Sequence, residues 1–382
     1  MSTSSFKIAH KLLTGAGAIE QLAAELTRLD VDNPLIVTDA ALVKSGTVAL
    51  ALAHLGERSY EIFDRVLPDP EIAIVEDCMR AYREGGHDGL IGLGGGSAID
   101  IAKSVAAYAG YHGALADLFG VDQVPRKGPP LIAIPTTAGT GSEVTNVAIL
   151  SDKAAQLKKG IVSDFLLPDV ALISPQMTLT CPRSVTAASG VDALVHAIES
   201  YLSLNASPIT DALAIGAIKL IAKALPKAYA NPANLQARDD MATASLMAGM
   251  AFGNAGVGAV HALAYPLGGR FNIAHGVSNA LLLPYVMHWN KLACVERMQD
   301  IAQAMGVNVT GLSVNEAADQ AVEAMTRLCA AVEIPSGLRS FGIPEDALAA
   351  MAVEAAGIER LMCNNPRQLS AADIEKIYRA AY

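Results

Sequence analysis

The chain has 382 residues, of which 52% are hydrophobic and 17% are charged. A chain of this length is too long for one compact domain, so we expect two. The formal net charge is −10, and no run of lysine and arginine is longer than two residues. These features exclude a track for nucleic-acid phosphates and favour a small-molecule partner.

The cysteines and the first residues predict a cytoplasmic protein. The 5 cysteines are odd in number, widely spaced and form no CxxC pair, which favours reduced thiols. The opening segment, MSTSSFKIAHKLLTG, contains no apolar run of the length that a secretory signal needs. Residues 241–269 lack charge over the length of a membrane span, but Asn254, His261 and several glycines interrupt them. We therefore expect a buried helix pair there and no membrane association.

Residues 1–182 are predicted to form an α/β domain with a doubly wound sheet. Short apolar segments with glycine or aspartate turns occur at 34–40, 88–97 and 129–137. Residues 72–84 have the apolar periodicity of a helix that packs on a sheet. Strands that alternate with helices are typical of a mostly parallel sheet covered on both faces.

Residues 183–382 are predicted to form an all-α domain. After about Pro182 alanine, leucine and methionine dominate, and β-branched clusters become rare. Helical segments are expected at 212–225, 241–250 and 317–332.

A glycine-rich run, GLGGGS at 92–97, follows one predicted strand and precedes a predicted helix. Glycines let the backbone approach an anion, and a helix N-terminus offers free N–H groups, so the run is typical of a phosphate cradle. It departs from the GxGxxG fingerprint because Ser97 replaces the last glycine, and it is not a Walker A loop because no GK[ST] follows. A plain tight turn is the alternative.

Two further features fit a dinucleotide. The segment PTTAGTGSE at 135–143 leaves the next strand and is rich in hydroxyls and glycines, although an N-cap ahead of Glu143 would explain it too. Asp39 ends the strand-like run at 35–38, where a carboxylate can bind a ribose 2′-OH and would repel the 2′-phosphate of NADP. A turn-forming aspartate is the alternative.

Three histidines and one aspartate in the second half predict a metal site. Asp192 and His196 lie four residues apart in a helical segment, hence on one face and one turn apart. His261 and His275 lie in apolar, glycine-rich segments. Burying these groups without a shared partner would be costly, and a divalent cation supplies one. The N₃O set suits Fe²⁺ or Zn²⁺, and an open metal position would polarise an alcohol oxygen.

Four motifs in this order resemble the iron-containing (group III) alcohol dehydrogenases, which are related in fold to dehydroquinate synthase. They are GGGSAID at 94–100, PTTAGTGSEVT at 135–145, GVDALVHAIESY at 190–201 and HALAYPLGGRFNIAHGVSNALLLPYV at 261–286. The resemblance covers nearly the whole chain. It implies an N-terminal nucleotide-binding α/β domain, a C-terminal helical domain, an active site in the cleft between them, and a homodimer or larger assembly.

The resemblance also implies roles for individual residues. The metal ligands would be Asp192, His196, His261 and His275, with Fe²⁺ as the expected metal and Zn²⁺ as the alternative. The cofactor would be NAD, which Asp39 supports over NADP. The positions that match those lining the dinucleotide are Asp39, Gly95, Gly96, Ser97, Asp100, Thr136, Thr137, Thr140 and Lys158.

Tyr265 departs from the family pattern, in which many members carry a histidine one helical turn from the ligand here numbered His261. That histidine is thought to help relay a proton. A tyrosine hydroxyl can also relay a proton, although it is a poor base at neutral pH; the alternative is that Tyr265 only packs and that water carries the proton. Arg270, near His275, either attracts an anionic substrate group or is an exposed surface arginine.

We therefore expect a metal-dependent alcohol dehydrogenase or aldehyde reductase that moves hydride reversibly between NAD(H) and a small alcohol or aldehyde. An NAD- and metal-dependent lyase of the dehydroquinate synthase type is the second hypothesis, but the polar, basic substrate site of that family is missing from the apolar C-terminal motifs. A catalytically silent assembly protein is the third, and the intact ligand set argues against it.

Overall fold

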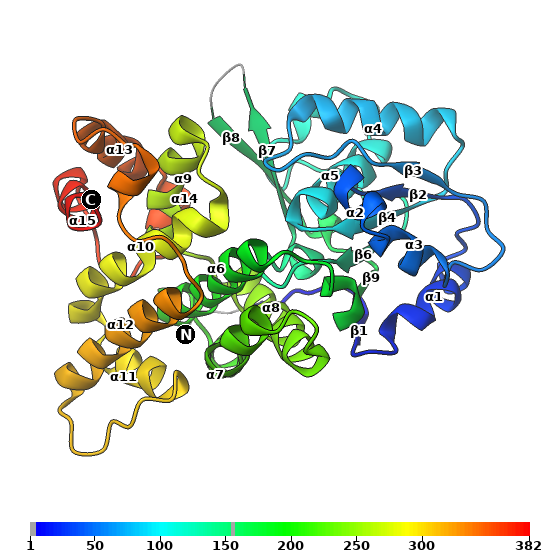
Figure 1. Ribbon diagram of the computed structural model, residues 1–382. Helices are drawn as coiled ribbons and strands as arrows, with labels where there is room; N and C mark the ends of the chain where they lie inside the picture. Colours follow the sequence, from blue (N-terminus) through cyan, green and yellow to red (C-terminus); the bar gives the residue numbers. More distant parts are fainter. Residues whose placement is uncertain (1–4, 154–156) are drawn as a thin grey trace. The chain divides into compact units, whose positions relative to one another are not determined.

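The computed structural model describes residues 5–153 and 157–382 (Figure 1). The chain divides into two compact units. One, Lys7–Cys181, contains all the strands of the described residues, and the other, residues 5–6 and Pro182–Tyr382, has only helices as regular secondary structure in its described part. The predicted fold class, α/β followed by all-α, is confirmed.

A six-stranded sheet forms the centre of the N-terminal unit. Its strand order is β1-β9-β6-β4-β2-β3, and every neighbouring pair is parallel. The two strands that precede the predicted cofactor segments, β4 and β6, are neighbours in the middle of the sheet. The strands are β1 (Leu12–Thr14), β2 (Pro34–Val37), β3 (Glu61–Phe63), β4 (Gly89–Gly94), β6 (Leu131–Pro135) and β9 (Val170–Ile173).

Helices cover both faces of this sheet because successive strand residues point to opposite sides. Leu35 and Val37 of β2 belong to one apolar core, with residues of α4 (Ile72–Glu84) and α5 (Gly96–Ala109). Ile36, between them, belongs to a second core with residues of α1 (Leu22–Arg28) and α3 (Thr47–Leu52). The doubly wound arrangement and the helix at 72–84 are therefore confirmed.

A second, three-stranded sheet was not predicted. Strand β8 (Leu157–Val162) lies between β5 (Gly120–Val121), which is parallel to it, and β7 (Val147–Asp152), which is antiparallel. Lys158 and Lys159 interrupt the apolar alternation that would mark β8 as a strand.

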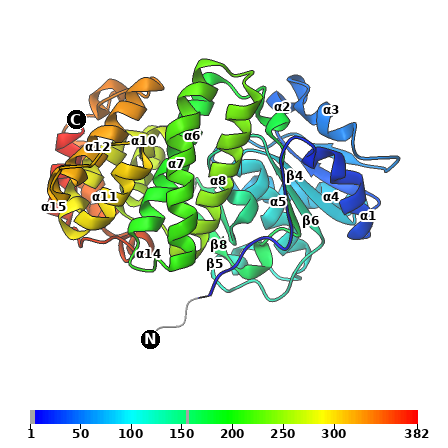
Figure 2. The same ribbon diagram turned by 90° about the horizontal axis from the view of Figure 1, so that it is seen from below.

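Three long helices lie side by side at the start of the C-terminal unit (Figure 2). They are α6 (Arg183–Leu202), α7 (Pro208–Ala230) and α8 (Leu235–Ala255). The longer helices that follow are α9 (Ala259–Phe271), α10 (His275–Asn290), α11 (Val295–Ala304), α12 (Val314–Ala331), α13 (Ala347–Ala356) and α15 (Ala371–Ala380).

The uncharged segment at 241–269 folds as most of α8 and most of α9, and the pair is bent by 101°. Gly256 lies in the turn with a φ of +78°, a conformation that side chains disfavour. No single helix in the described ranges has the length and hydropathy of a membrane crossing, and only this bent pair reaches both together. The bend places His261 in the first turn of α9.

Candidate functional site

The two predicted cofactor segments meet at the carboxyl ends of β4 and β6. Gly95 is the N-cap of α5, and the Thr136 amide donates to the carbonyl of Gly94 at 3.0 Å. A Cβ on Gly96 would lie 2.9 Å from Cγ2 of Thr140, so only glycine allows this approach. The glycine-rich and hydroxyl-rich segments thus form one surface, at the edge where parallel sheets bind ligands.

Two polar residues, Thr38 and Asp39, follow strand β2 beside this surface. Asp39 caps α2 (Ala40–Lys44) by accepting a hydrogen bond from the Leu42 amide at 2.9 Å, which is the turn-forming role that the sequence left open. That bond uses one of its two carboxylate oxygens. The hydroxyl of Thr38 is buried and has no hydrogen-bond partner among the described residues, as expected where a polar ligand supplies one.

Lys158, another position predicted to line the dinucleotide, lies on β8. Its ammonium forms an ion pair with the carboxylate of Asp69 at 2.5 Å.

A buried lysine ties the two segments together. Lys103 of α5 is 0% exposed, and its ammonium donates to the Ser142 hydroxyl (3.1 Å), to the Thr145 carbonyl (2.7 Å) and to the Val147 carbonyl (3.0 Å). One turn earlier on α5, the carboxylate of Asp100 accepts from the hydroxyl of Ser142 and, at 3.0 Å, from the amide of Ile149. Both oxygens of Asp100 therefore bind protein groups.

Burial disfavours the charged forms in this network. It lowers the pKa of Lys103 to about 8 and raises the pKa of Glu143, which is 2% exposed, to about 7. The attraction between Lys103 and the carboxylates of Asp100 and Glu143 opposes both shifts. No local sequence pattern indicates a role for this lysine, because its partners lie about 40 residues away.

Three of the four predicted metal ligands converge in the C-terminal unit. The donor atoms of Asp192 (α6), His261 (α9) and His275 (first residue of α10) all lie within 4.8 Å of one another. Nε2 of His261 and Nε2 of His275 are each 3.9 Å from Oδ1 of Asp192. Burial acts to raise the pKa of Asp192, but the histidines outweigh it and lower that pKa.

The fourth predicted ligand, His196, lies beside this cluster. Its ring stacks on that of His261 with centroids 4.7 Å apart, and on that of Phe252 at 4.2 Å. His196 lies one turn from Asp192 on α6 and is 5% exposed. Like His275 and His261, it lowers the pKa of Asp192, so all three histidines act on the same carboxylate.

One nitrogen in the cluster fits a metal ligand. Nε2 of His261 is buried and has no hydrogen-bond partner in the described part of the chain. Its other ring nitrogen, Nδ1, lies 2.6 Å from the carboxylate of Glu199. A carboxylate at Nδ1 keeps that nitrogen protonated and leaves the Nε2 lone pair free for a cation.

Glu199 and Asn279 support the cluster, and the sequence analysis missed both. Glu199 (α6, 3% exposed) also accepts a hydrogen bond from the Val260 amide at 2.6 Å. Asn279 lies one turn after His275 and donates to Oδ1 of Asp192 at 2.6 Å. A carboxylate seven residues after Asp192, on the same helix face, was the available signal for Glu199.

Two asparagines hold the segment that leads into α9. Asn364 donates to the Val257 carbonyl at 2.9 Å, and Asn365 accepts from the Ala259 amide at 3.3 Å. A Cβ on Gly258 would lie 3.0 Å from Oδ1 of Asn365. The entry to α9, and with it His261, is therefore fixed from the C-terminal part of the chain.

Tyr265 and Arg270 follow His261 on α9. Tyr265 is half-buried, and its hydroxyl accepts a hydrogen bond from Nη2 of Arg360 at 3.2 Å. Arg270 is exposed and forms an ion pair with Glu354 at 2.8 Å. The structure thus favours the surface role that the sequence left open for Arg270.

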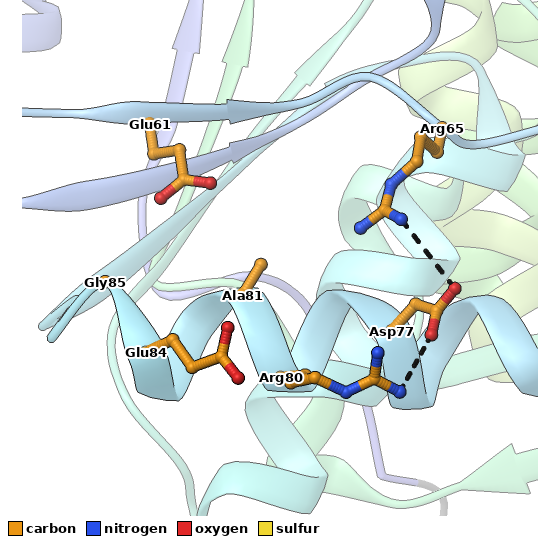
Figure 3. A pocket seen from close by; sticks show the side chains of 7 residues that line it. All are labelled: Glu61, Arg65, Asp77, Arg80, Ala81, Glu84 and Gly85. Carbon is orange, nitrogen blue, oxygen red and sulfur yellow. Dashed lines mark hydrogen bonds and ion pairs between the residues drawn. The ribbon is translucent and has the colours of Figure 1, made fainter.

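A cavity of 350 Å³ in the N-terminal unit lies apart from these groups, between β3 and α4 (Figure 3). Asp77 pairs with Arg80 at 3.0 Å and with Arg65 at 3.9 Å, and Glu61 lies 3.4 Å from His87. Because Asp77 pairs with both arginines that line it, we interpret this cavity as a solvated surface feature.

Known proteins match the chain from end to end. The family described as iron-containing alcohol dehydrogenase matches residues 9–175, and the C-terminal part of the Fe-containing alcohol dehydrogenase family matches 186–382. Long-chain-alcohol dehydrogenase 1 of Geobacillus thermodenitrificans is 48% identical over 373 residues, which are 96% of this chain and 94% of that protein.

Solved structures agree with this match. A crystal structure of 1,3-propanediol oxidoreductase superposes with a TM-score of 0.97 at 40% identity, covering 100% of both chains. Sulfoacetaldehyde reductase from Bifidobacterium kashiwanohense, solved in complex with NAD+, superposes with a TM-score of 0.91 at 30% identity, covering 100% of this chain and 99% of that one. The chain therefore belongs to the iron-containing alcohol dehydrogenase family.

Proposed function

We propose that this enzyme transfers hydride reversibly between NAD(H) and a small alcohol or aldehyde at a metal centre held by Asp192, His196, His261 and His275. The observation that carries the assignment is the convergence of three donor groups within 4.8 Å around a buried nitrogen, Nε2 of His261, that lacks a hydrogen-bond partner among the described residues. Such an atom is costly unless a ligand pairs with it. His196 would complete the N₃O set from its position against the ring of His261.

The residues around the centre have separable roles in the reaction. The expected metal is Fe²⁺, with Zn²⁺ as the alternative, because both accept imidazole and carboxylate ligands. When bound, the metal supplies Lewis acidity that favours loss of the alcohol proton, and NAD+ accepts the hydride. Glu199 holds His261 in the tautomer that a ligand needs, and Tyr265 offers a hydroxyl for proton relay one turn along α9.

We place the dinucleotide on the surface at the carboxyl ends of β2, β4 and β6. The helix N-terminus at Gly95, Gly96 and Ser97 suits the phosphates, and the free carboxylate oxygen of Asp39 suits a ribose. The hydroxyls of Thr136, Thr137 and Thr140 line the same surface, with Asp100 and Lys158 as further candidates. Hydride transfer further requires the nicotinamide ring to reach the substrate carbon beside the metal centre.

Two further parts of the proposal concern setting and assembly. We infer a cytoplasmic protein because 4 of the 5 cysteines are buried, and the buried thiols of Cys78, Cys294 and Cys329 form no disulfide, which suits a reducing compartment. Family resemblance favours a homodimer or larger homo-oligomer.

Glu199→Gln is expected to weaken metal binding by about 10- to 100-fold, because an amide cannot balance the charge of a metal-bound His261 as a carboxylate does. The measurement is the metal dissociation constant, obtained by competition with a coloured chelator. Glu354→Gln is the matched control, since Glu354 pairs with Arg270 at the surface of the same unit. Equal metal affinities in the Glu199 variant and the wild type would remove Glu199 from the support of the centre.

The proposed function is tested by anaerobic purification and metal analysis, followed by assay of NADH formation from short alcohols, diols and hydroxy acids. The protein is assayed as isolated, after metal removal, and after reloading with Fe²⁺ or Zn²⁺. We expect NADH formation that disappears with the metal and returns with it. Full turnover without metal would contradict the centre, and a protein that holds metal and NAD but reduces no NAD with any alcohol would favour the lyase alternative.

A further inference from the structure

Arg360 places an uncompensated positive charge beside the helix that carries His261. It lies in α14 (Glu359–Met362), which packs on α9. The side chain is exposed and makes no ion pair with any carboxylate of residues 5–153 and 157–382. Arg270, the arginine within α9 itself, is instead neutralised by Glu354.

Tyr265 connects this charge to the proposed metal centre. Tyr265 follows His261 by four residues on α9, so the two side chains lie on one face with Cβ atoms about 6 Å apart. The hydroxyl oxygen of Tyr265 accepts a hydrogen bond from Nη2 of Arg360 at 3.2 Å. The guanidinium thus contacts a side chain that lies one helical turn from His261.

The side chain of Asn364 holds the backbone of Arg360 beside α9. The amide group of Asn364 donates to the Arg360 carbonyl at 3.2 Å and to the Val257 carbonyl at 2.9 Å. Val257 lies in the turn between α8 and α9, just before the helix that carries His261. The same amide therefore fixes the backbone of Arg360 and the entry to α9, while the Tyr265 hydroxyl contacts the guanidinium itself.

The chemistry of the pair suits an anion. A guanidinium carries five N–H donors, and the contact with Tyr265 uses one of them. Because the Tyr265 oxygen accepts that bond, its own O–H remains able to donate. Two adjacent donors, one of them charged, match the two oxygens of a carboxylate. The chain as a whole carries a net charge of −10 and repels anions, so a local cation would decide whether one can bind.

We infer that Arg360 and Tyr265 bind an anionic group at the far end of the substrate, so that the enzyme acts on short acidic aldehydes and the matching hydroxy acids. The inference rests on the proposed function and names the substrate class of the same site. A neutral alkyl substrate would make no charge-assisted contact with the guanidinium.

The test compares 4-oxobutanoate with its methyl ester, which has the same aldehyde and chain but no charge. kcat/KM for NADH-dependent reduction is measured for both compounds in the metal-loaded wild type and in Arg360→Gln, Arg360→Lys and Arg270→Gln. We expect the wild type to prefer the acid, and Arg360→Gln to lose roughly tenfold of that preference, mainly through KM. Arg360→Lys should keep part of it, and Arg270→Gln should keep all of it.

The selectivity ratio distinguishes failure of this inference from failure of the proposed function. A wild type that prefers the ester, or a ratio that Arg360→Gln leaves unchanged, overturns the inference while the reduction itself upholds the dehydrogenase. An equal loss in Arg270→Gln also overturns it, since a general surface field would then explain the preference. If the metal-loaded wild type reduces neither aldehyde and oxidises no alcohol, the proposed dehydrogenase function is contradicted, and the inference that rests on it is contradicted too.

Discussion

Replacing His261 with alanine is expected to remove the bound metal and to lower kcat/KM by at least about 1000-fold, since a catalytic metal contributes several kcal/mol of transition-state stabilisation. His261 is the central member of the cluster. Its Nε2 faces Asp192 at 3.9 Å, and its ring lies 4.7 Å from that of His196 and 5.4 Å from that of His275. The measurements are metal content per chain and NADH formation.

The matched control is His288→Ala. His288 is an exposed histidine on α10, the helix that begins with His275. The control should keep wild-type metal content and turnover. The His261 variant should keep its far-UV circular dichroism spectrum and its affinity for NAD+, because the proposed dinucleotide surface belongs to the other unit. Wild-type metal content and turnover in the His261 variant would falsify the ligand assignment.

Elements with regular hydrophobic periods could be predicted from the sequence. The helix expected at 72–84 has those bounds in the structure, and the strands expected around residues 35, 91 and 133 are β2, β4 and β6. Each has an apolar face that matches its geometry, so local pattern and tertiary burial agree. The small sheet of β5, β7 and β8 could not be predicted because β5 has only two residues and β8 begins beside two lysines.

Groups that act through distant partners could not be predicted in this way. Glu199 contacts His261 across 62 residues, and Asn279 contacts Asp192 across 87. The packing of α6, α9 and α10 creates these contacts, and no sequence period encodes it. The metal ligands themselves stood out because imidazoles in uncharged segments are costly without a partner.

The two arginines near the metal centre illustrate the same limit. Arg270 lies five residues from His275 in the sequence, which made it the candidate for binding an anion, yet it is paired with Glu354. Arg360 lies 95 residues from Tyr265 and contacts its hydroxyl. Proximity in the sequence suggested that a cation lies beside the metal ligands. Only the fold shows that Arg360 contacts Tyr265.

Replacing Lys103 with methionine is expected to lower the free energy of unfolding of the N-terminal unit by about 3–5 kcal/mol, the usual cost of leaving buried charged groups without compensation. Methionine preserves most of the stem but removes the ammonium that binds Ser142, Thr145 and Val147. The carboxylates of Asp100 and Glu143 would then lose the charge that compensates them. Urea unfolding followed by far-UV circular dichroism measures the loss.

A double variant separates charge from packing. Asp100→Asn combined with Lys103→Met removes both charges, and an asparagine can still accept from the Ile149 amide. We expect the double variant to recover part of the lost stability. Lys44→Met, at an exposed position on α2, is the matched control and should stay within about 0.5 kcal/mol of the wild type. A double variant no more stable than Lys103→Met would assign the loss to packing of the lysine stem.

The single variant Lys103→Met also tests whether Lys103 supports cofactor binding. Lys103 holds Ser142 and Thr145 against α5, and the helix begins with the glycines that Thr140 approaches closely. If that alignment creates the dinucleotide surface, NAD+ should bind more weakly to Lys103→Met under conditions where the variant remains folded, while metal content in the C-terminal unit stays at the wild-type level. Titration of NAD+ by calorimetry and metal analysis of the same sample test both expectations. Unchanged NAD+ affinity in a folded, destabilised variant would make Lys103 a purely structural residue, and would show that the hydroxyl-rich segment keeps its place without the buried charge.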